Sequence, residues 1–203
     1  MTTPSDVLDL WFGPAPAATG PDLRARFARW FDGDPALARD IAARLAGATE
    51  RAIAGELDGW AEEARGCVAL VLLLDQCPRS LYRDSAGAFA GDERAQQVAS
   101  SAFERGLDRE LTFEQRLFLI LPFVHAEHLA TQERGVVRMH ELVAAVPEPR
   151  RPFLGMGIEQ ANKYRGVISR FGRFPQRNQL LGRASTADEV DLLREWKEQA
   201  RWI

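Results

Sequence analysis

Asp75, Arg79 and Arg83 are the first residues of this sequence whose types and spacing could do chemistry, because an acid and two arginines follow one another at near-helical intervals. They come directly after an apolar run, residues 67–74, which reads CVALVLLL. A run of this length fits a buried strand or a buried helix, and its leucine and alanine content favours the helix. Because proline interrupts helical hydrogen bonding, we expect Pro78 to end this helix and Asp75 to lie in its last turn.

The expected position of Asp75 is unfavourable for a carboxylate. The helix dipole places partial negative charge at this end and costs an acid roughly 0.3–1 kcal/mol. We therefore expect a cation beside Asp75, supplied by Arg79, by Arg83 or by an arginine from later in the chain. Such a pair could belong to a catalytic site, or it could only fix the turn that follows. Both interpretations stay open at this point.

A second candidate region is the basic segment 170–183, which reads RFGRFPQRNQLLGR. From residue 160 to residue 187 the sequence contains six basic residues and no acidic one. Arginine binds carboxylate and phosphate groups through paired N–H donors, and an amide can orient the bound group. We expect Arg173, Arg177 and Asn178 to bind an anion, although these side chains could equally pair with acids elsewhere and hold the C-terminal segment to the body of the protein.

Two further residues could transfer a proton. His125 and Glu127 lie near the end of an expected helix over residues 112–128, and either could act as a general acid or base on a bound ligand together with Asp75. His125 and His128 also have a spacing that zinc sites use, but the HExxH pattern is absent. We therefore expect no metal and no cofactor. A nucleophilic role for Cys77 is disfavoured, because the end of a helix destabilises a thiolate.

Composition limits the kind of protein. A chain of 203 residues with 46% apolar content and a net charge of −3 can bury a substantial core in one domain, expected to span residues 1–203. The charge argues against a nucleic-acid or membrane-surface partner. The sequence shows neither a signal peptide nor a membrane-spanning run, and its two cysteines lie in one expected helix, so we expect a soluble, cytoplasmic, reduced protein.

The hydrophobic periodicity predicts helices throughout. Capping boxes are expected at Thr112 with Gln115 and at Thr186 with Glu189. No stretch has the β-branched and aromatic character of a strand, so the expected fold is all-α, an antiparallel array of about eight or nine helices. We expect the helices over residues 5–12, 22–31, 34–54, 61–77, 92–105, 112–128, 132–146 and 153–170, with a last one from residue 186.

Short motifs along almost the whole chain resemble the bacterial family known as domain of unknown function 924. The motifs that carry the resemblance are Trp11-Phe12-Gly13, Leu72 to Arg79, Leu81-Tyr82-Arg83, Leu121-Pro122-Phe123 with His125 and Glu127, Gln132-Glu133-Arg134, Phe171 to Asn178, Leu181-Gly182-Arg183 and Ser185-Thr186. The resemblance implies an all-helical fold of the tetratricopeptide-like kind and no established activity.

The chain departs from the family pattern at several of these motifs. The pattern has Phe and Asn where this chain has Cys77 and Ser80, often has Ser at Ala126, and has histidines where this chain has Tyr164 and Gln176. If those histidines transfer protons in relatives, this protein lacks them. The polar residues that do match are Asp75, Arg79, Arg83, His125, Glu127, Arg173, Arg177 and Asn178.

These residues suit anion recognition better than a complete acid–base mechanism. We expect a small anionic ligand, bound and in some form turned over, with Asp75, His125 and Glu127 as catalytic candidates. The alternative is a scaffold that binds another protein, or a second copy of itself as a homodimer, through a groove between helices. In that alternative the acids and arginines form a buried structural clamp.

Overall fold

The computed structural model describes residues 1–13 and 20–198, and within these ranges the backbone forms helices and connecting turns but no strand. The expected all-α fold is confirmed. The α-helices are α1 (Pro4–Phe12), α2 (Gly20–Phe31), α3 (Pro35–Arg44), α4 (Ala46–Ile53), α5 (Ala64–Val71), α6 (Cys77–Leu81), α7 (Asp92–Glu104), α8 (Phe113–Val124), α9 (Leu129–Ala145), α10 (Arg151–Phe171) and α11 (Ala187–Glu198).

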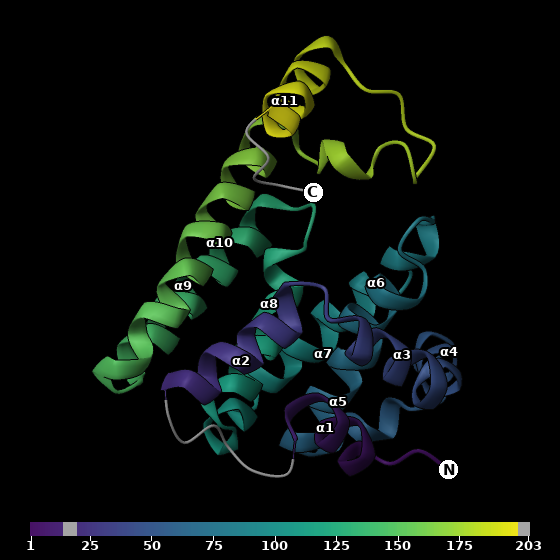
Figure 1. The fold of residues 1–203 in the computed structure, drawn as a ribbon, viewed down its shortest axis with the longest axis vertical. Coiled ribbons are helices and arrows are strands. Elements are labelled where there is room, and N and C mark those ends of the chain that lie inside the picture. The colour runs from purple at the N-terminus through teal and green to yellow at the C-terminus, as the bar shows by residue number, and fades with distance from the viewer. Residues whose placement is uncertain (14–19, 199–203) are drawn as a thin grey trace.

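Helix α5 packs against α1, α7 and α8, and α9 packs against α8 and α10. Figure 1 shows α9 and α10 as two long neighbouring helices along one side of the molecule, with α11 near their end. The two capping boxes expected from the sequence are present, because Thr112 and Gln115 exchange hydrogen bonds at the start of α8 and Thr186 and Glu189 do so before α11.

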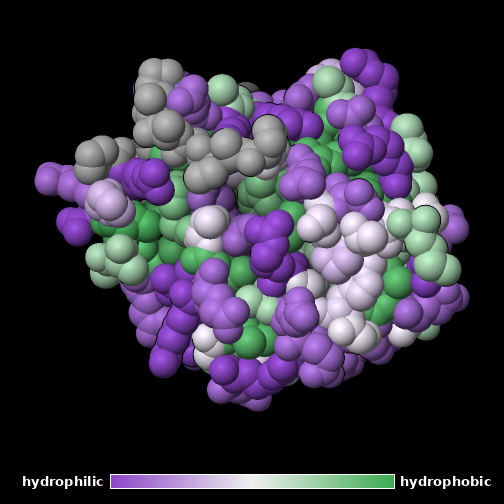
Figure 2. Space-filling model, turned by 90° about the horizontal axis from the view of Figure 1, so that it is seen from below, coloured by the Kyte–Doolittle hydropathy of each residue, from purple (hydrophilic) through white to green (hydrophobic). Residues whose placement is uncertain are grey.

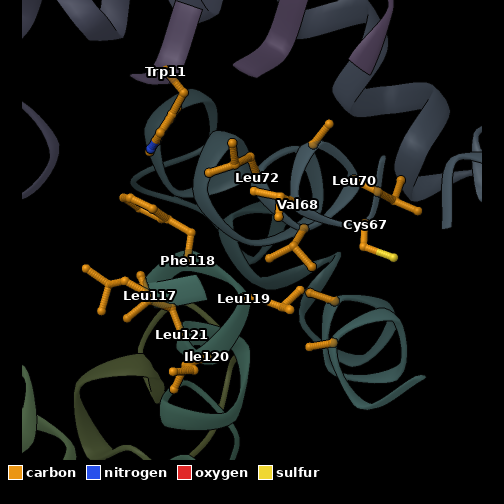
Figure 3. Packing of buried hydrophobic residues seen from close by; sticks show 14 of the residues in the cluster. Trp11, Cys67, Val68, Leu70, Leu72, Leu117, Phe118, Leu119, Ile120 and Leu121 are labelled. Atoms are coloured by element: carbon orange, nitrogen blue, oxygen red, sulfur yellow. The ribbon is translucent and has the colours of Figure 1, made fainter. Parts of the chain in front are cut away.

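The main core lies where α1, α5 and α8 meet (Figure 3). The Trp11 ring packs edge-on against the Phe118 ring, with 5.4 Å between centroids. Each side chain from Val68 to Leu74 is fully buried, as the apolar run predicts. Burying one such leucine stabilises the fold by roughly 1.5–3 kcal/mol, so this segment contributes strongly to stability.

Pro78 does not end the central helix, which corrects the expectation from the sequence. Residues Leu72–Gln76 form a π-helical turn, in which the Cys77 N–H bonds the carbonyl of Leu72. This turn restarts the helix as α6, and Pro78 falls in the first turn of α6. Proline is tolerated there because the missing N–H would have had no helical partner. Such π turns occur frequently at functional sites.

The helix expected over residues 112–128 is shorter than predicted and ends at Val124. Residues 125–128 form the connection to α9 and do not share one helical face. The buried side chain of Gln132 explains this turn, because its Nε2 donates to the carbonyls of Val124 at 2.6 Å and of Ala126 at 2.8 Å. These bonds satisfy carbonyls that a longer helix would have used internally.

The surface is mixed in character. Figure 2 shows hydrophilic residues over much of the face seen from below, with apolar residues visible between them. Among the described helices, none combines the length and the apolar character needed to cross a bilayer. A second, small apolar cluster of Val167, Ile168 and Phe174 lies beneath α11 and anchors the C-terminal segment to α10.

Candidate functional site

A cavity of ≈ 360 Å³ lies where α6, the connection after α8 and the segment after α10 come together. Three arginines line it, Arg79, Arg83 and Arg177, together with His125. They come from three parts of the chain that are far apart in sequence. Four of the site residues expected from the sequence therefore line the same cavity.

Asp75 lies behind this wall and orients the histidine. Its carboxylate oxygens are 2.8 Å and 3.0 Å from Nδ1 of His125, and the Asp75 side chain is fully buried. Burial raises the pKa of the Asp75 carboxyl, but the charges of Arg79 and His125, with hydrogen bonds from His125 and Gln76, outweigh it and hold this pKa well below its ordinary value. The carboxyl is therefore ionised and can only accept hydrogen bonds.

Asp92 joins two of the cavity arginines. Its carboxylate accepts two hydrogen bonds from Arg79, at 2.8 Å and 3.0 Å, and a third from Arg177 at 3.0 Å. Arg79 also lies 3.1 Å from the Asp75 carboxylate, so it is the cation expected beside that acid. In the sequence, Asp92 is recognisable only as the start of a helix, so its place at the site depends on the tertiary structure.

Arg177 lies between two aromatic rings. Its guanidinium carbon is 4.5 Å from the centroid of Phe89 and 4.6 Å from that of Phe174. Burial lowers the pKa of Arg177, and the nearby charge of Arg79 lowers it further, although Asp92 opposes both. This lowered pKa reflects mainly the loss of water around the guanidinium, which disfavours its charged form. A bound anion would favour the charged form again.

Arg83 differs from the other two cavity arginines. It is exposed, and it makes no hydrogen bond or ion pair with any described residue. Its guanidinium therefore keeps its full set of N–H donors for a ligand.

The remaining wall of the cavity is largely apolar. Phe89 and Phe174 contribute ring faces, and the ring of Tyr164 packs against Phe174 with 5.2 Å between centroids. Gln176 completes the rim. Tyr164 and Gln176, where the resemblance described above leads us to expect histidine in relatives, both line this cavity.

Three other candidates lie outside the cavity lining, in a C-terminal clamp formed by Glu127, Arg173, Asn178, Arg183 and Glu189. Glu127 accepts a forked pair of hydrogen bonds from Arg183, at 2.6 Å and 2.9 Å, and another from the backbone N–H of Phe174. Arg173 forms a similar pair with Glu189, at 2.7 Å and 2.9 Å.

Asn178 completes this clamp. It donates to the Ser185 hydroxyl at 3.0 Å and accepts from Arg183 at 3.0 Å. Burial raises the pKa of Glu127, but the hydrogen bonds from Arg183 and Phe174 outweigh it and lower this pKa below the ordinary value. Glu127 is thus an ionised partner of arginine here, with its oxygens occupied. For Glu127, Arg173 and Asn178 the geometry fits the structural interpretation.

Cys77 is buried, and burial raises the pKa of its thiol to about 12. A thiol in this state is a poor nucleophile. Within residues 1–13 and 20–198, no three His, Cys, Asp or Glu side chains are grouped so that they could hold a metal ion.

Comparison with known proteins gives the family. The family model described as bacterial protein of unknown function (DUF924) matches residues 7–196. The chain belongs to this family. The chain is also similar to a solved structure of a protein of unknown function from Agrobacterium tumefaciens, with 35% sequence identity and a TM-score of 0.76. The match covers 95% of this chain and 97% of that one. Among the curated proteins, no sequence matches the chain.

Proposed function

We propose that this DUF924 protein binds a small anionic metabolite in the cavity lined by Arg79, Arg83, Arg177 and His125. The observation that carries the proposal is the convergence of three arginines on one cavity, whose described lining contains no carboxylate. Arginine forks match the geometry of carboxylate and phosphate groups.

The charge balance around the cavity supports an anion. Among the described residues, the three cavity arginines form ion pairs with two carboxylates, those of Asp75 and Asp92, so one positive charge is left when His125 is neutral. Arg83 supplies that charge on the exposed side. Because Arg79 and Arg177 are held by Asp92, they present their remaining N–H groups in fixed directions, which reduces the entropy lost when a ligand binds.

The shape of the cavity indicates the size of the ligand. A volume of ≈ 360 Å³ is near the lower end of the range for small-molecule sites, roughly 300–1,000 Å³. Phe89, Phe174 and Tyr164 offer aromatic surface next to the arginines. A compact ligand with one anionic group and an apolar or planar body fits both parts of the wall.

A thermal-shift experiment tests the proposal. Wild-type protein is heated with inorganic phosphate, with small aliphatic and aromatic carboxylates and with phosphorylated metabolites, all at one ionic strength. A ligand at 100 times its dissociation constant stabilises the folded state by about 2.7 kcal/mol. We expect at least one of the carboxylates or phosphates to raise the melting temperature.

Arg83→Ala and Arg65→Ala form a matched pair for this experiment. Both arginines are exposed and have no hydrogen-bond or ion-pair partner among the described residues, but only Arg83 lines the cavity. Neither variant should change the melting temperature of the free protein. A smaller ligand shift in Arg83→Ala than in Arg65→Ala, measured near the dissociation constant, supports the site. Equal shifts in both variants, or no shift with any anion, would contradict it.

A further inference from the structure

The Asp75–His125 pair leaves one ring nitrogen of His125 available. Because the ionised Asp75 carboxylate can only accept hydrogen bonds, the Nδ1 atom that contacts it at 2.8 Å must carry a proton. In the neutral imidazole the other nitrogen, Nε2, then has a free lone pair. No described residue makes a hydrogen bond to Nε2, and His125 lines the cavity while Asp75 is buried behind it.

This arrangement is that of a general base. A buried carboxylate that fixes the tautomer and stabilises the imidazolium is how Asp–His pairs make histidine an effective base. The Asp75 and His125 side chains are brought together across 50 residues of sequence, and the π-helical turn at Leu72–Gln76 holds the acid in place. The Gln132 side chain holds the turn that carries His125.

The lining of the cavity indicates what the base acts on. None of the described residues that line it is a serine, threonine, cysteine or lysine, so the usual side-chain nucleophiles are missing from this wall. The cavity is open to solvent past the exposed side chains of Arg83 and Gln176. Water can therefore reach Nε2.

We infer that the cavity is a hydrolytic site, in which Nε2 of His125 takes a proton from water and the substrate is a small carboxylic ester that carries an anionic group. The inference rests on the proposed function, because Arg83 must hold that anionic group. It goes further in assigning a reaction to the cavity.

Hydrolysis of the ester takes place in two stages. As Nε2 accepts a proton from water, the water oxygen forms a bond to the ester carbonyl carbon, and the carbonyl electron pair moves onto its oxygen. When this tetrahedral intermediate collapses, the bond to the leaving oxygen breaks, and that oxygen receives the proton from Nε2. Asp75 keeps its charge throughout and is a positioning residue.

Arg177 is placed to stabilise the negative oxygen of the intermediate. Two of its N–H groups donate to Asp92 and to the backbone carbonyl of His125, both at 3.0 Å. A guanidinium has five N–H groups in all, so further donors remain for a ligand. Fixed donors of this kind stabilise charge that develops in a transition state.

Two matched esters test the inference. 4-Carboxyphenyl acetate carries an anionic group on an aromatic ring, and 4-carbamoylphenyl acetate is a neutral compound of nearly the same shape. We expect the wild-type protein to release the phenol from the anionic ester with saturation kinetics and with a kcat/KM about tenfold higher than for the neutral ester, which is the discrimination that one well-placed charge interaction gives.

Three variants separate the roles. His125→Gln should lower kcat by about 100-fold or more, with KM little changed, because it removes the base and not the arginines. Arg83→Ala should raise KM by up to about fivefold, as expected for an exposed ion pair. Arg65→Ala should match the wild type. Hydrolysis that survives in His125→Gln, or no hydrolysis above the rate in buffer, would overturn the inference.

The thermal-shift experiment distinguishes an incorrect hydrolytic role from an incorrect anion site. If 4-hydroxybenzoate or inorganic phosphate stabilises the wild type in an Arg83-dependent way but no ester is hydrolysed, the anion site stands and the hydrolytic role does not. If neither stabilisation nor hydrolysis occurs, both are wrong.

A spectroscopic measurement does not depend on how His125→Gln folds. The sequence has three histidines, and His128 and His140 are exposed. In the double variant His128→Gln/His140→Gln, nitrogen NMR of the one remaining imidazole reports its tautomer. We expect the proton of the neutral ring on Nδ1 and a bare Nε2. A proton on Nε2 of the neutral ring would overturn the inference.

Discussion

The carboxylate of Asp75 contacts Nδ1 of His125 at 2.8 Å, and no part of the Asp75 side chain reaches solvent. The same carboxylate lies 3.1 Å from Arg79. Two ionisable groups, His125 and Arg79, thus depend on one buried acid. The low pKa of Asp75 means that its contribution to stability is present at pH values above the ordinary value of 3.8 and is lost only as the pH falls below it.

Asp75→Asn should therefore destabilise the protein strongly at neutral pH. Removing one partner of a buried ion pair leaves Arg79 short of a counter-charge, and such changes cost about 3–5 kcal/mol. Urea unfolding of the variant measures the loss. Asp84→Asn, at an exposed position without a partner among the described residues, is the control and should be neutral. A loss below about 1 kcal/mol in Asp75→Asn would show that the pair is not essential to the fold.

Gly91→Ala should destabilise the protein, because Gly91 packs closely against the π-helical turn. Because Pro78 has no N–H, the carbonyl of Leu74 lacks its usual helical donor, and the backbone of Gly91 packs against it so closely that an added Cβ would lie 2.2 Å from the carbonyl oxygen. We expect a loss of about 1–3 kcal/mol, as for overpacked interiors.

Gly47→Ala is the matched control for Gly91→Ala. Gly47 lies within α4, and an added Cβ there would meet nothing within 4 Å. This variant should gain up to about 1 kcal/mol from helix propensity. Thermal melts of the two variants should therefore shift in opposite directions. Equal shifts would contradict the close packing of Gly91 against Leu74.

The C-terminal helix should respond to acid through Glu189. Its hydrogen bond with Arg173, opposed by burial and aided by the Thr186 N–H, lowers the pKa of Glu189 from 4.5 to about 2. A lowered pKa in the folded state contributes stability above the ordinary value, and this stability is lost as the pH falls from about 4.5 towards 2. NMR shifts of the α11 amides should show α11 loosening in this range.

Glu189→Gln should remove most of this pH dependence and should weaken α11 already at pH 7. Glu195→Gln changes an exposed acid on the same helix that has no partner among the described residues, and it should behave like the wild type. If Glu189→Gln keeps the wild-type response to acid, another group must be responsible.

Both cysteines should be unreactive in the folded protein. Burial raises the pKa of the Cys77 thiol to about 12 and also raises that of Cys67, so little thiolate forms at pH 8. 5,5′-Dithiobis(2-nitrobenzoic acid) should label neither cysteine in buffer and both in denaturant. Ser5→Cys adds an exposed thiol on α1 and should react at once. Rapid labelling of the wild type would mean that the core opens readily around the π-helical turn.

Local features of the sequence predicted much of the fold. The spacing of Thr112 with Gln115 and of Thr186 with Glu189 was sufficient to place two helix starts, because a capping box needs only residues within one turn. The burial of residues 67–74 followed from their composition. The prediction that Pro78 ends the central helix is wrong, because the π-helical turn before it places Pro78 in the first turn of a new helix. Local propensity does not show where such a turn forms.

The sequence by itself determined that the chain is all-helical, that an acid follows its most apolar segment, and that arginines gather near its C-terminal end. Only the tertiary structure decided which of these arginines meet which acids. Asp92 pairs with Arg177 across 85 residues, and Glu127 with Arg183 across 56. The physical reason is that charge pairing depends on distances in space, which the packing of α6, α8 and α10 sets. Arg177 and Arg173 are only four residues apart, yet Arg177 lines the cavity and Arg173 belongs to the C-terminal clamp.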